Sequence, residues 1–231
     1  MVQNTPIDNG FPKSRPNRLF HPVEAPVSHF PIQSVNIDWD RLIAKRPTVL
    51  NTIDQMPVYL LKPEVLVLLD AEKHPTRRLL LYLMWTTGAR ISEVLALTPA
   101  SFIDDGYDFG LILKTLKQRP GRPSKASLQR SPKRYVPIVD HLLQDRIQSY
   151  LYAGKFKKTE RLFPMARQTV NRHINDVVER VGGAPFSISA HTFRHSFAIH
   201  LLLHGRPLKY VGQLLGHKSI DSTEIYTNVE L

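Results

Sequence analysis

From Val58 onward, apolar residues recur three and four positions apart, which is the spacing of one face of an α-helix. Pro63 and Pro75 each fit the first position of such a segment, where the missing N–H of proline loses no helical hydrogen bond. The pattern predicts one helix after Pro63 and a second that ends near Gly88. Further helices are predicted at about 91–97, 140–153, 167–182, 192–204, 207–214 and 219–227.

Two stretches depart from the helical spacing. Residues 109–114 and 134–139 are β-like in composition, and the segment between them contains prolines and glycine. They predict an antiparallel hairpin with an unusually long connection. The predicted fold class is therefore mainly α with a small antiparallel β-sheet (α+β).

The first 57 residues have a different character from the rest. They hold 8 of the 18 prolines, spaced so that no helix of ordinary length fits before Ile37. A short helix around Trp39–Lys45 is possible, because Asp38 can cap it. The sequence thus predicts an extended or partly disordered arm at 1–57 and one folded domain at 58–231.

Composition narrows the function classes. The 231 residues include 31 Lys and Arg against 20 Asp and Glu, a net charge of +11, and no cysteine. Disulfide scaffolds, zinc ribbons and thiol nucleophiles are excluded. The densest apolar run, Leu79–Trp85, is far shorter than the roughly 20 residues of a membrane span, so we expect a cytoplasmic protein with no membrane partner. The excess positive charge favours a polyanionic partner, above all nucleic acid.

Most of the excess charge lies between residues 114 and 134, which hold eight basic residues and no acidic one. Such a run is commonly a solvated loop, but on a basic protein it favours contact with DNA phosphates. Besides Lys114, the candidates are Lys117, Arg119, Arg122, Lys125, Arg130, Lys133 and Arg134.

Four segments contain polar residues that a hydrophobic core does not require, at 87–93, 113–115, 191–195 and 215–226. They supply arginines, a lysine, imidazoles and a phenol, a set suited to phosphoryl transfer at a DNA backbone. Two guanidinium groups can grip the non-bridging oxygens of a phosphodiester. A tyrosine can attack phosphorus, a lysine can protonate the departing oxygen, and histidines can hold or deprotonate the reacting groups.

These segments resemble the catalytic signature of the tyrosine recombinase (phage integrase) family over about Leu60 to Asn228. The T-G-x-R-x-S-E motif matches Thr87 to Glu93, and the H-x-x-R motif matches His191 to Arg194. An L-G-H segment precedes a T-x-x-Y segment, with nine residues from its histidine to the tyrosine. The resemblance implies a tyrosine recombinase catalytic domain with six active-site residues: Arg90, Lys114, His191, Arg194, His217 and Tyr226, the nucleophile.

The resemblance also gives Glu93 the role of a supporting carboxylate, while Lys117 remains a rival to Lys114. Other patterns have alternative interpretations. Histidines at 191, 195, 200 and 204 form two i, i+4 pairs, but without thiolates or an H-E-x-x-H motif we expect no metal and no cofactor. His195 and His204 are interpreted as structural or solvent-facing. Residues 208–226 could also imitate a helix-turn-helix reader, which explains neither arginine motif.

The sequence departs from the family pattern at both ends. The arm is too short for the usual core-binding domain, which predicts a catalytic-domain-only member resembling small plasmid resolvases and invertases. Only five residues follow Tyr226, too few for the helix that many relatives dock on a neighbouring protomer.

The resemblance implies a site-specific recombinase that cleaves and rejoins double-stranded DNA through a 3′-phosphotyrosine intermediate. It would act as a homo-oligomer, a tetramer on DNA, with possible accessory DNA-bending proteins, in resolution, inversion or integration for a bacterial plasmid or mobile element. Two alternatives are a non-cleaving accessory protein of the same fold and a type IB topoisomerase. A metal-dependent nuclease is disfavoured because the adjacent carboxylates of Asp104 and Asp105 should diverge.

Overall fold

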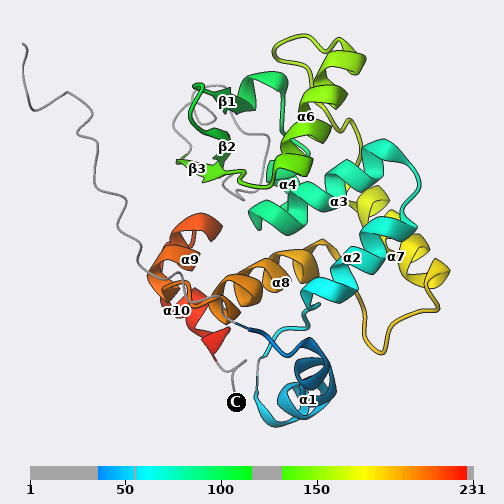
Figure 1. Ribbon diagram of the computed structural model, residues 1–231, viewed down its shortest axis with the longest axis vertical. Helices are drawn as coiled ribbons and strands as arrows, with labels where there is room; N and C mark the ends of the chain where they lie inside the picture. Colours follow the sequence, from blue (N-terminus) through cyan, green and yellow to red (C-terminus); the bar gives the residue numbers. More distant parts are fainter. Residues whose placement is uncertain (1–35, 55, 116–131, 228–231) are drawn as a thin grey trace, which may run out of the picture. The chain divides into compact units, whose positions relative to one another are not determined.

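The computed structural model describes residues 36–54, 56–115 and 132–227. Contacts divide the chain into two units, Met1–Ser34 and Val35–Leu231, and the described residues belong to the second. Its elements, shown in Figure 1, are α1 (Trp39–Thr52), α2 (Lys62–Ala71), α3 (Pro75–Thr87), α4 (Ile91–Val94), the 3₁₀ turn η2 (Pro99–Ser101), β1 (Phe102–Asp104), β2 (Phe109–Lys114), β3 (Lys133–Pro137), α6 (His141–Gly154), α7 (Arg167–Arg180), α8 (Ala190–Leu203), α9 (Leu208–Leu215) and α10 (Asp221–Glu224).

Local sequence signals set most helix ends. The Asp38 carboxylate accepts a hydrogen bond from the Arg41 backbone N–H at 3.0 Å and so caps α1. A proline lies in the first turn of both α2 and α3. The chain leaves α3 through Gly88 and α9 through Gly216, both in the left-handed conformation that glycine adopts without strain.

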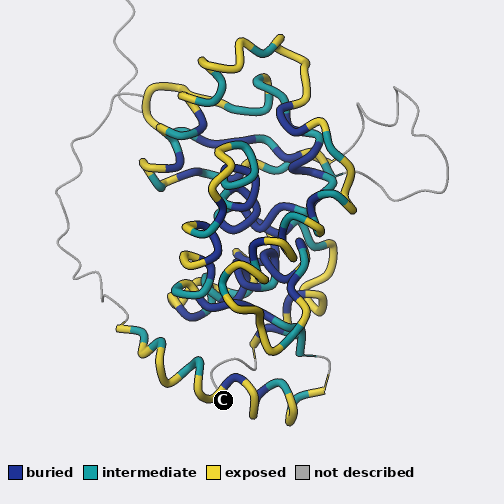
Figure 2. The backbone as a smooth tube through the Cα atoms, turned by 90° about the vertical axis from the view of Figure 1, so that its right-hand side faces the viewer, coloured by how far each residue is buried: buried dark blue, intermediate teal, exposed yellow. Residues whose placement is uncertain are grey.

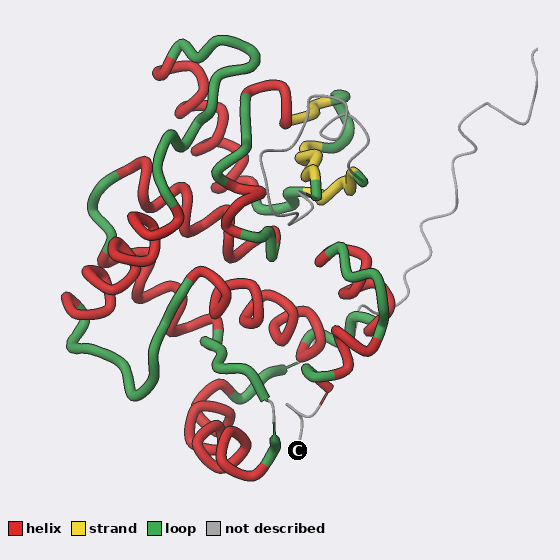
Figure 3. The backbone as a smooth tube through the Cα atoms, turned by 180° about the vertical axis from the view of Figure 1, so that it is seen from behind, coloured by secondary structure: helices red, strands yellow, loops and turns green. Residues whose placement is uncertain are grey.

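The three strands form one antiparallel sheet in the order β1-β2-β3. In the predicted hairpin, Leu113 pairs with Arg134 and Lys114 pairs with Lys133. Strand β1 was not predicted, because three residues beside two aspartates carry too little periodicity. Figure 3 shows the three strands gathered in one place in an otherwise helical fold, so the predicted fold class is confirmed.

Helices α3 and α8 pack against each other and form the centre of the core. Leu83, Met84, Phe193 and Ala198 on these two helices are essentially inaccessible to solvent. Figure 2 shows most of the buried residues in the interior of the molecule, where α3 and α8 lie. Most residues of α1 are exposed. The arginine motif at the end of α3 and the histidine-arginine motif at the start of α8 therefore stand on two helices that pack at the centre of the core.

Three helices, α1, α4 and α10, differ clearly from their predicted lengths. Helix α10 covers only Asp221–Glu224, where a helix at about 219–227 was predicted. Helix α4 ends at Val94 rather than near residue 97. The residues that follow it form 3₁₀-type hydrogen bonds between positions i and i−3, such as Ala96 N–H to Glu93 O at 3.2 Å, before the chain reaches Pro99. Helix α1 continues to Thr52, through Pro47, where only a short helix to Lys45 was predicted.

Residues 36–57 belong to the folded unit rather than to the arm, except that residue 55 is not described. The Trp39 ring stacks on His200 of α8 with ring centroids 6.2 Å apart, and Arg46 forms an ion pair with Glu64 of α2. The compact unit thus begins more than twenty residues before the predicted boundary at 58. Residues 1–35 lie outside the described residues. Across the described ranges, none of the helices combines the length and the apolar character that crossing a bilayer requires.

Candidate active site

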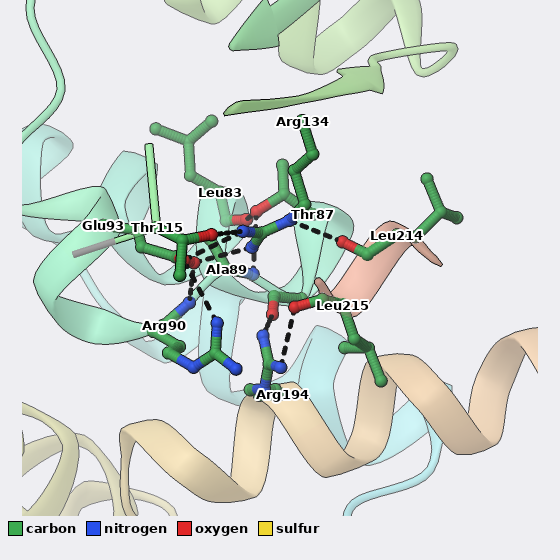
Figure 4. A network of polar contacts seen from close by, with 11 residues as sticks. Leu83, Thr87, Ala89, Arg90, Glu93, Thr115, Arg134, Arg194, Leu214 and Leu215 are labelled. Atoms are coloured by element: carbon green, nitrogen blue, oxygen red, sulfur yellow. Dashed lines mark hydrogen bonds and ion pairs between the residues drawn. The ribbon is translucent and has the colours of Figure 1, made fainter. Parts of the chain in front are cut away.

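Arg194 joins three parts of the chain that are distant in sequence. Its guanidinium donates from Nη1 to the Gly88 carbonyl at 2.6 Å and from Nη2 to the Leu215 carbonyl at 2.8 Å (Figure 4). The residue is only 5% exposed. These bonds use two of the five guanidinium N–H donors and fix the orientation of the remaining three. Arg194 therefore ties the start of α8 to the ends of α3 and α9.

Glycine is required at position 88 for two reasons. Its φ of 57° lies in the left-handed region, and a Cβ atom there would stand 2.2 Å from Cδ1 of Phe197. The close approach lets the Gly88 carbonyl reach Arg194 while the chain turns toward Arg90. The glycine of the T-G-x-R-x-S-E motif thus allows the turn and the close packing at this point. The arginine and the glutamate of the motif face the site.

Glu93 holds Arg90 from two sides. Its carboxylate accepts the Arg90 backbone N–H at 2.8 Å and lies 3.2 Å from Arg90 Nη1. The same carboxylate receives two hydrogen bonds from Arg134, at 2.8 and 2.6 Å. The Glu93 side chain is 1% exposed, whereas that of Arg90 is 31% exposed. Glu93 therefore anchors a guanidinium that still reaches solvent.

The Glu93 carboxylate and the arginines around it shift each other's pKa values. Burial acts to raise the pKa of Glu93, but the hydrogen bonds and charge of Arg134, with help from Arg90, outweigh it and hold that pKa below its usual range. Burial, reinforced by the charge of Arg90, lowers the pKa of Arg194 to about 10. At neutral pH the cluster thus contains an ionised carboxylate and protonated guanidiniums.

Tyr226 lies inside the molecule, 2% exposed, with its hydroxyl 2.8 Å from Nδ1 of His195. Burial raises the pKa of the phenol, and the charges of Arg194 and Arg90 act in the opposite direction. Both signature arginines are therefore close enough to favour the phenolate. The tyrosine hydroxyl stands between the positive charge that would stabilise its anion and an imidazole that can accept its proton.

The other predicted histidine on this side, His217, is oriented by the T-x-x-Y segment. A 2.8 Å hydrogen bond joins its Nδ1 to the hydroxyl of Thr223, which is fully buried. Burial, followed by the charges of Arg194, Arg90 and Arg134, lowers the pKa of His217 to about 4. The imidazole is therefore neutral at physiological pH, and the Thr223 bond at Nδ1 leaves Nε2 to face a reacting group.

His191 and Lys114 lie at the edge of the site. His191 is exposed, and its ring centroid is 6.4 Å from that of His195. Burial of part of the ring, together with the charges of Arg194, Arg90 and Arg167, lowers its pKa. Lys114 is exposed at the end of β2, and no hydrogen bond or ion pair among the described residues joins it to the other five. The structure therefore gathers Arg90, Arg194, His217 and Tyr226, with His191 beside them, and leaves Lys114 on the rim.

The residues predicted to bind DNA fall into three groups. Those at 117, 119, 122, 125 and 130 lie outside the described residues. Lys133 is exposed on β3. Arg134, in contrast, points inward with a side chain only 10% exposed, and it is bonded to Glu93 and to the Leu214 carbonyl. Arg134 was expected to contact a DNA phosphate. In the structure its guanidinium nitrogens instead donate hydrogen bonds to acceptors within the protein.

Sequence reasoning missed three contributors to this site. His195 was interpreted as structural or solvent-facing, yet its ring contacts the tyrosine hydroxyl. Thr223 was noted only as part of a motif, and Arg134 only as one basic residue among eight. The signal for His195 was its place directly after Arg194, the last residue of the H-x-x-R motif. No group of three or more His, Cys, Asp or Glu side chains in the described part of the chain could hold a metal.

A helical domain that brings two arginines, imidazoles and a tyrosine together has the architecture expected of a tyrosine recombinase catalytic domain. The sequence pattern of the phage integrase family matches residues 59–231. The chain belongs to this family and is a tyrosine-type site-specific recombinase.

Individual relatives agree with this assignment. A protein of Escherichia coli named "Resolvase" is 37% identical over 215 residues, covering 84% of this chain and 82% of the relative. Another from Escherichia coli, "Probable site-specific recombinase in afa region", is 34% identical over 209 residues, covering 88% of this chain and 82% of that protein. The crystal structure of the XerH site-specific recombinase bound to palindromic difH substrate superposes with a TM-score of 0.61 at 21% identity, covering 75% of this chain and 50% of that one. The last match concerns the fold alone.

Proposed function

We propose that this recombinase cleaves and rejoins double-stranded DNA at specific sites by forming a covalent bond between Tyr226 and a DNA 3′ phosphate. The observation that carries the proposal is the position of the Tyr226 hydroxyl, 2.8 Å from His195 and within the field of Arg194 and Arg90. A phenol in this setting is a nucleophile beside two groups suited to a phosphodiester.

The cleavage step balances with the residues at hand. Arg90 and Arg194 grip the two non-bridging oxygens and stabilise the negative charge that grows on them. The Tyr226 oxygen bonds to phosphorus, and its proton passes to the neutral Nδ1 of His195. The bond from phosphorus to the 5′ oxygen breaks, and Lys114 gives that oxygen a proton. Because the phosphotyrosine retains the bond energy, the 5′ hydroxyl of another strand can reverse the reaction.

Histidines 191 and 217 would complete the hold on the phosphate. His217 is neutral and oriented by Thr223, so it can exchange a hydrogen bond with a phosphate oxygen without a change in charge. His191 lies on the exposed side, where DNA would approach. Glu93 supports the reaction through Arg90 and takes no part in proton transfer.

We further propose that the biological role is resolution or inversion for a plasmid or mobile element, carried out by a tetramer on two DNA sites. Similarity to the "Resolvase" of Escherichia coli over most of both chains supports the role. DNA as partner is supported by the DNA-bound state of XerH. Helper proteins that bend DNA would then determine which pairs of sites meet.

A two-site plasmid tests this proposal. A supercoiled plasmid is built with two copies, in direct repeat, of the DNA that flanks the gene, and it is incubated with the wild-type protein or with Tyr226→Phe. We expect two smaller circles from the wild type and none from the variant, because phenylalanine keeps the ring and removes the attacking oxygen. A second plasmid with the copies inverted should give inversion of the segment between them.

Other products would replace the proposal with one of its alternatives. Relaxation of a plasmid that lacks the sites, without exchange between sites, indicates a topoisomerase. Site-specific binding with no change of topology, even with bacterial extract added to supply helper proteins, indicates a non-cleaving accessory protein.

A further inference from the structure

Arg134 uses all three of its side-chain nitrogens. Nη1 and Nη2 donate to the two Glu93 oxygens at 2.8 and 2.6 Å, and Nε donates to the Leu214 carbonyl at 2.7 Å. Nη1 also lies 3.4 Å from the Thr115 hydroxyl. Figure 4 shows this guanidinium between the Glu93 side chain and the end of α9. Arg134 is thus a three-way tie between β3, α4 and α9.

Both ends of this tie lead directly to signature residues. Through Glu93, Arg134 shares a carboxylate with Arg90. Through Leu214 it holds the carbonyl adjacent to that of Leu215, which Arg194 holds. His217 follows these two carbonyls after a single glycine. The orientation of Arg90 and the place of His217 therefore depend on the same guanidinium.

The packing around this guanidinium is close enough to transmit a displacement. Gly216 has a φ of 68°, and a Cβ atom on it would stand 3.0 Å from Arg134 Nη1. A side chain at position 216 would adopt a strained left-handed backbone and would displace the Arg134 guanidinium by a few tenths of an ångström. A lysine at position 134 would keep the charge, but its single nitrogen cannot bind both carboxylate oxygens in parallel and reach the Leu214 carbonyl as well.

We propose that Arg134 is a positioning residue for strand cleavage, which sets Arg90 through Glu93 and His217 through Leu214, and that it is not a phosphate contact. This inference rests on the proposed function, because the positions it sets matter only if Arg90 and His217 act on a phosphodiester. It separates Arg134 from the other basic residues of the 114–134 segment, although all belong to one charge run in the sequence.

The test compares Arg134→Lys with a matched control, Arg46→Lys. Arg46 also binds both oxygens of a glutamate, Glu64, at 2.5 and 2.6 Å, and donates to the Tyr59 carbonyl at 3.3 Å. It ties α1 to α2 and does not touch the signature residues. Single-turnover formation of the covalent adduct on nicked DNA is measured well below the melting midpoint of each variant, with DNA affinity measured over a range of salt concentrations.

We expect Arg134→Lys to slow adduct formation on the order of 100-fold, the effect of a misplacement of about 1 Å at a reacting centre. Affinity and its salt dependence should stay at wild-type values, because the Arg134 guanidinium binds protein acceptors rather than phosphate. Arg46→Lys should lower the melting midpoint and leave the adduct rate unchanged. Hydrogen exchange on the DNA-free proteins should show faster exchange at residues 90–93 and 214–217 in Arg134→Lys only.

Two results would overturn the inference. One is an Arg134→Lys adduct rate equal to that of Arg46→Lys with unchanged exchange at both segments. The other is weaker binding with a shallower salt dependence, which would make Arg134 a phosphate contact. Failure of the wild type itself to form an adduct would overturn the proposed function instead, and the exchange data would still report whether Arg134 orders the two segments. If Arg134→Lys does not fold, Glu93→Asp is used instead. This change keeps the negative charge but moves the carboxylate away from Arg134, and the same rate, affinity and exchange results are expected.

Discussion

The contact between His195 and Tyr226 is the most direct link between a side chain and the reacting oxygen. Burial, followed by the charges of His191 and Arg194, lowers the pKa of His195 to about 4. The imidazole is therefore neutral at physiological pH and can accept the proton of the Tyr226 hydroxyl, which lies 2.8 Å away. In the proposed mechanism, His195 therefore orients the nucleophile and takes up its proton as the bond to phosphorus forms.

Replacing His195 with phenylalanine should slow adduct formation about 100-fold, the usual scale for removal of a general base. The ring volume is retained, so the change isolates the missing acceptor. Single-turnover assays on nicked DNA measure the rate. His204→Phe is the matched control at the C-cap of the same helix, because His204 packs against Trp39 and His200 rather than against the tyrosine. Equal rates for the two variants would contradict a role for His195.

The lowered pKa values of His195 and His217 predict an unusual pH profile. Both lie near 4, so both imidazoles stay neutral as pH falls from 8 to 5, whereas an ordinary histidine becomes protonated around pH 6.5. We therefore expect the second-order rate constant for adduct formation, which reports on the uncomplexed enzyme, to show no acid limb near pH 6.5. The measurement is that rate constant at subsaturating DNA and constant ionic strength. A tenfold fall per pH unit starting near 6.5 would show that an imidazole with an ordinary pKa controls the reaction.

At the scale of elements, the crossing of α3 and α8 fixes the distance between the two arginine motifs. The crossing is close at Gly88, where a Cβ atom would stand 2.2 Å from Phe197. A side chain there would separate the helices and pull the Gly88 carbonyl away from Arg194. Both the packing of α3 against α8 and the position of Arg194 therefore depend on Gly88.

Gly88→Ala should destabilise the fold more than Gly106→Ala. Both glycines have positive φ values, 57° and 84°, so each alanine costs about 1–2 kcal/mol of backbone strain. Only position 88 adds a steric clash, because nothing lies within 4 Å of a Cβ atom at position 106. Overpacking should contribute about 1–3 kcal/mol more at position 88. Denaturant unfolding measures both free energies, and equal losses would contradict the close approach.

The helices were predictable because their signals are local. Proline at the first turn, apolar spacing and a terminal glycine placed α3, and α6 to α9 lie within two residues of their predicted bounds. Helix α1 is longer than predicted because packing of Trp39 on α8 and of Arg46 on α2 stabilises a helix that continues through Pro47. Such contacts between distant segments leave no trace in local periodicity.

At the scale of the molecule, the signature residues are spread from position 90 to position 226 and are brought together by the ends of α3, α8 and α9. The order of the motifs predicted these residues, and the family assignment confirms the class of protein. The roles of Arg134, Thr223 and His195 depend on contacts across the fold, so composition and spacing could not assign them. A basic residue in a basic segment has the same sequence signal whether it faces DNA or a buried carboxylate.

The basic segment should dominate the electrostatic part of DNA binding. Replacing Lys117, Arg119, Arg122, Lys125 and Arg130 with alanine should weaken binding and reduce the slope of log K against log salt by about 0.9 for each phosphate that is no longer neutralised. The exposed lysines at 155, 157 and 158 provide a control, since their replacement also lowers the net charge, at a site after α6. Titration of labelled DNA at several salt concentrations measures both slopes. An unchanged slope in the five-residue variant would show that the segment is only solvated.

The proposed reaction requires that Tyr226 become covalently joined to DNA. The most direct measurement uses a nicked suicide substrate made from the flanks of the gene, from which the cleaved strand diffuses away and traps the intermediate. We predict an adduct that survives detergent, is destroyed by protease, maps to the peptide containing Tyr226, and is absent with Tyr226→Phe. An adduct that persists in Tyr226→Phe, or no wild-type adduct on DNA that the protein binds site-specifically, would contradict the account.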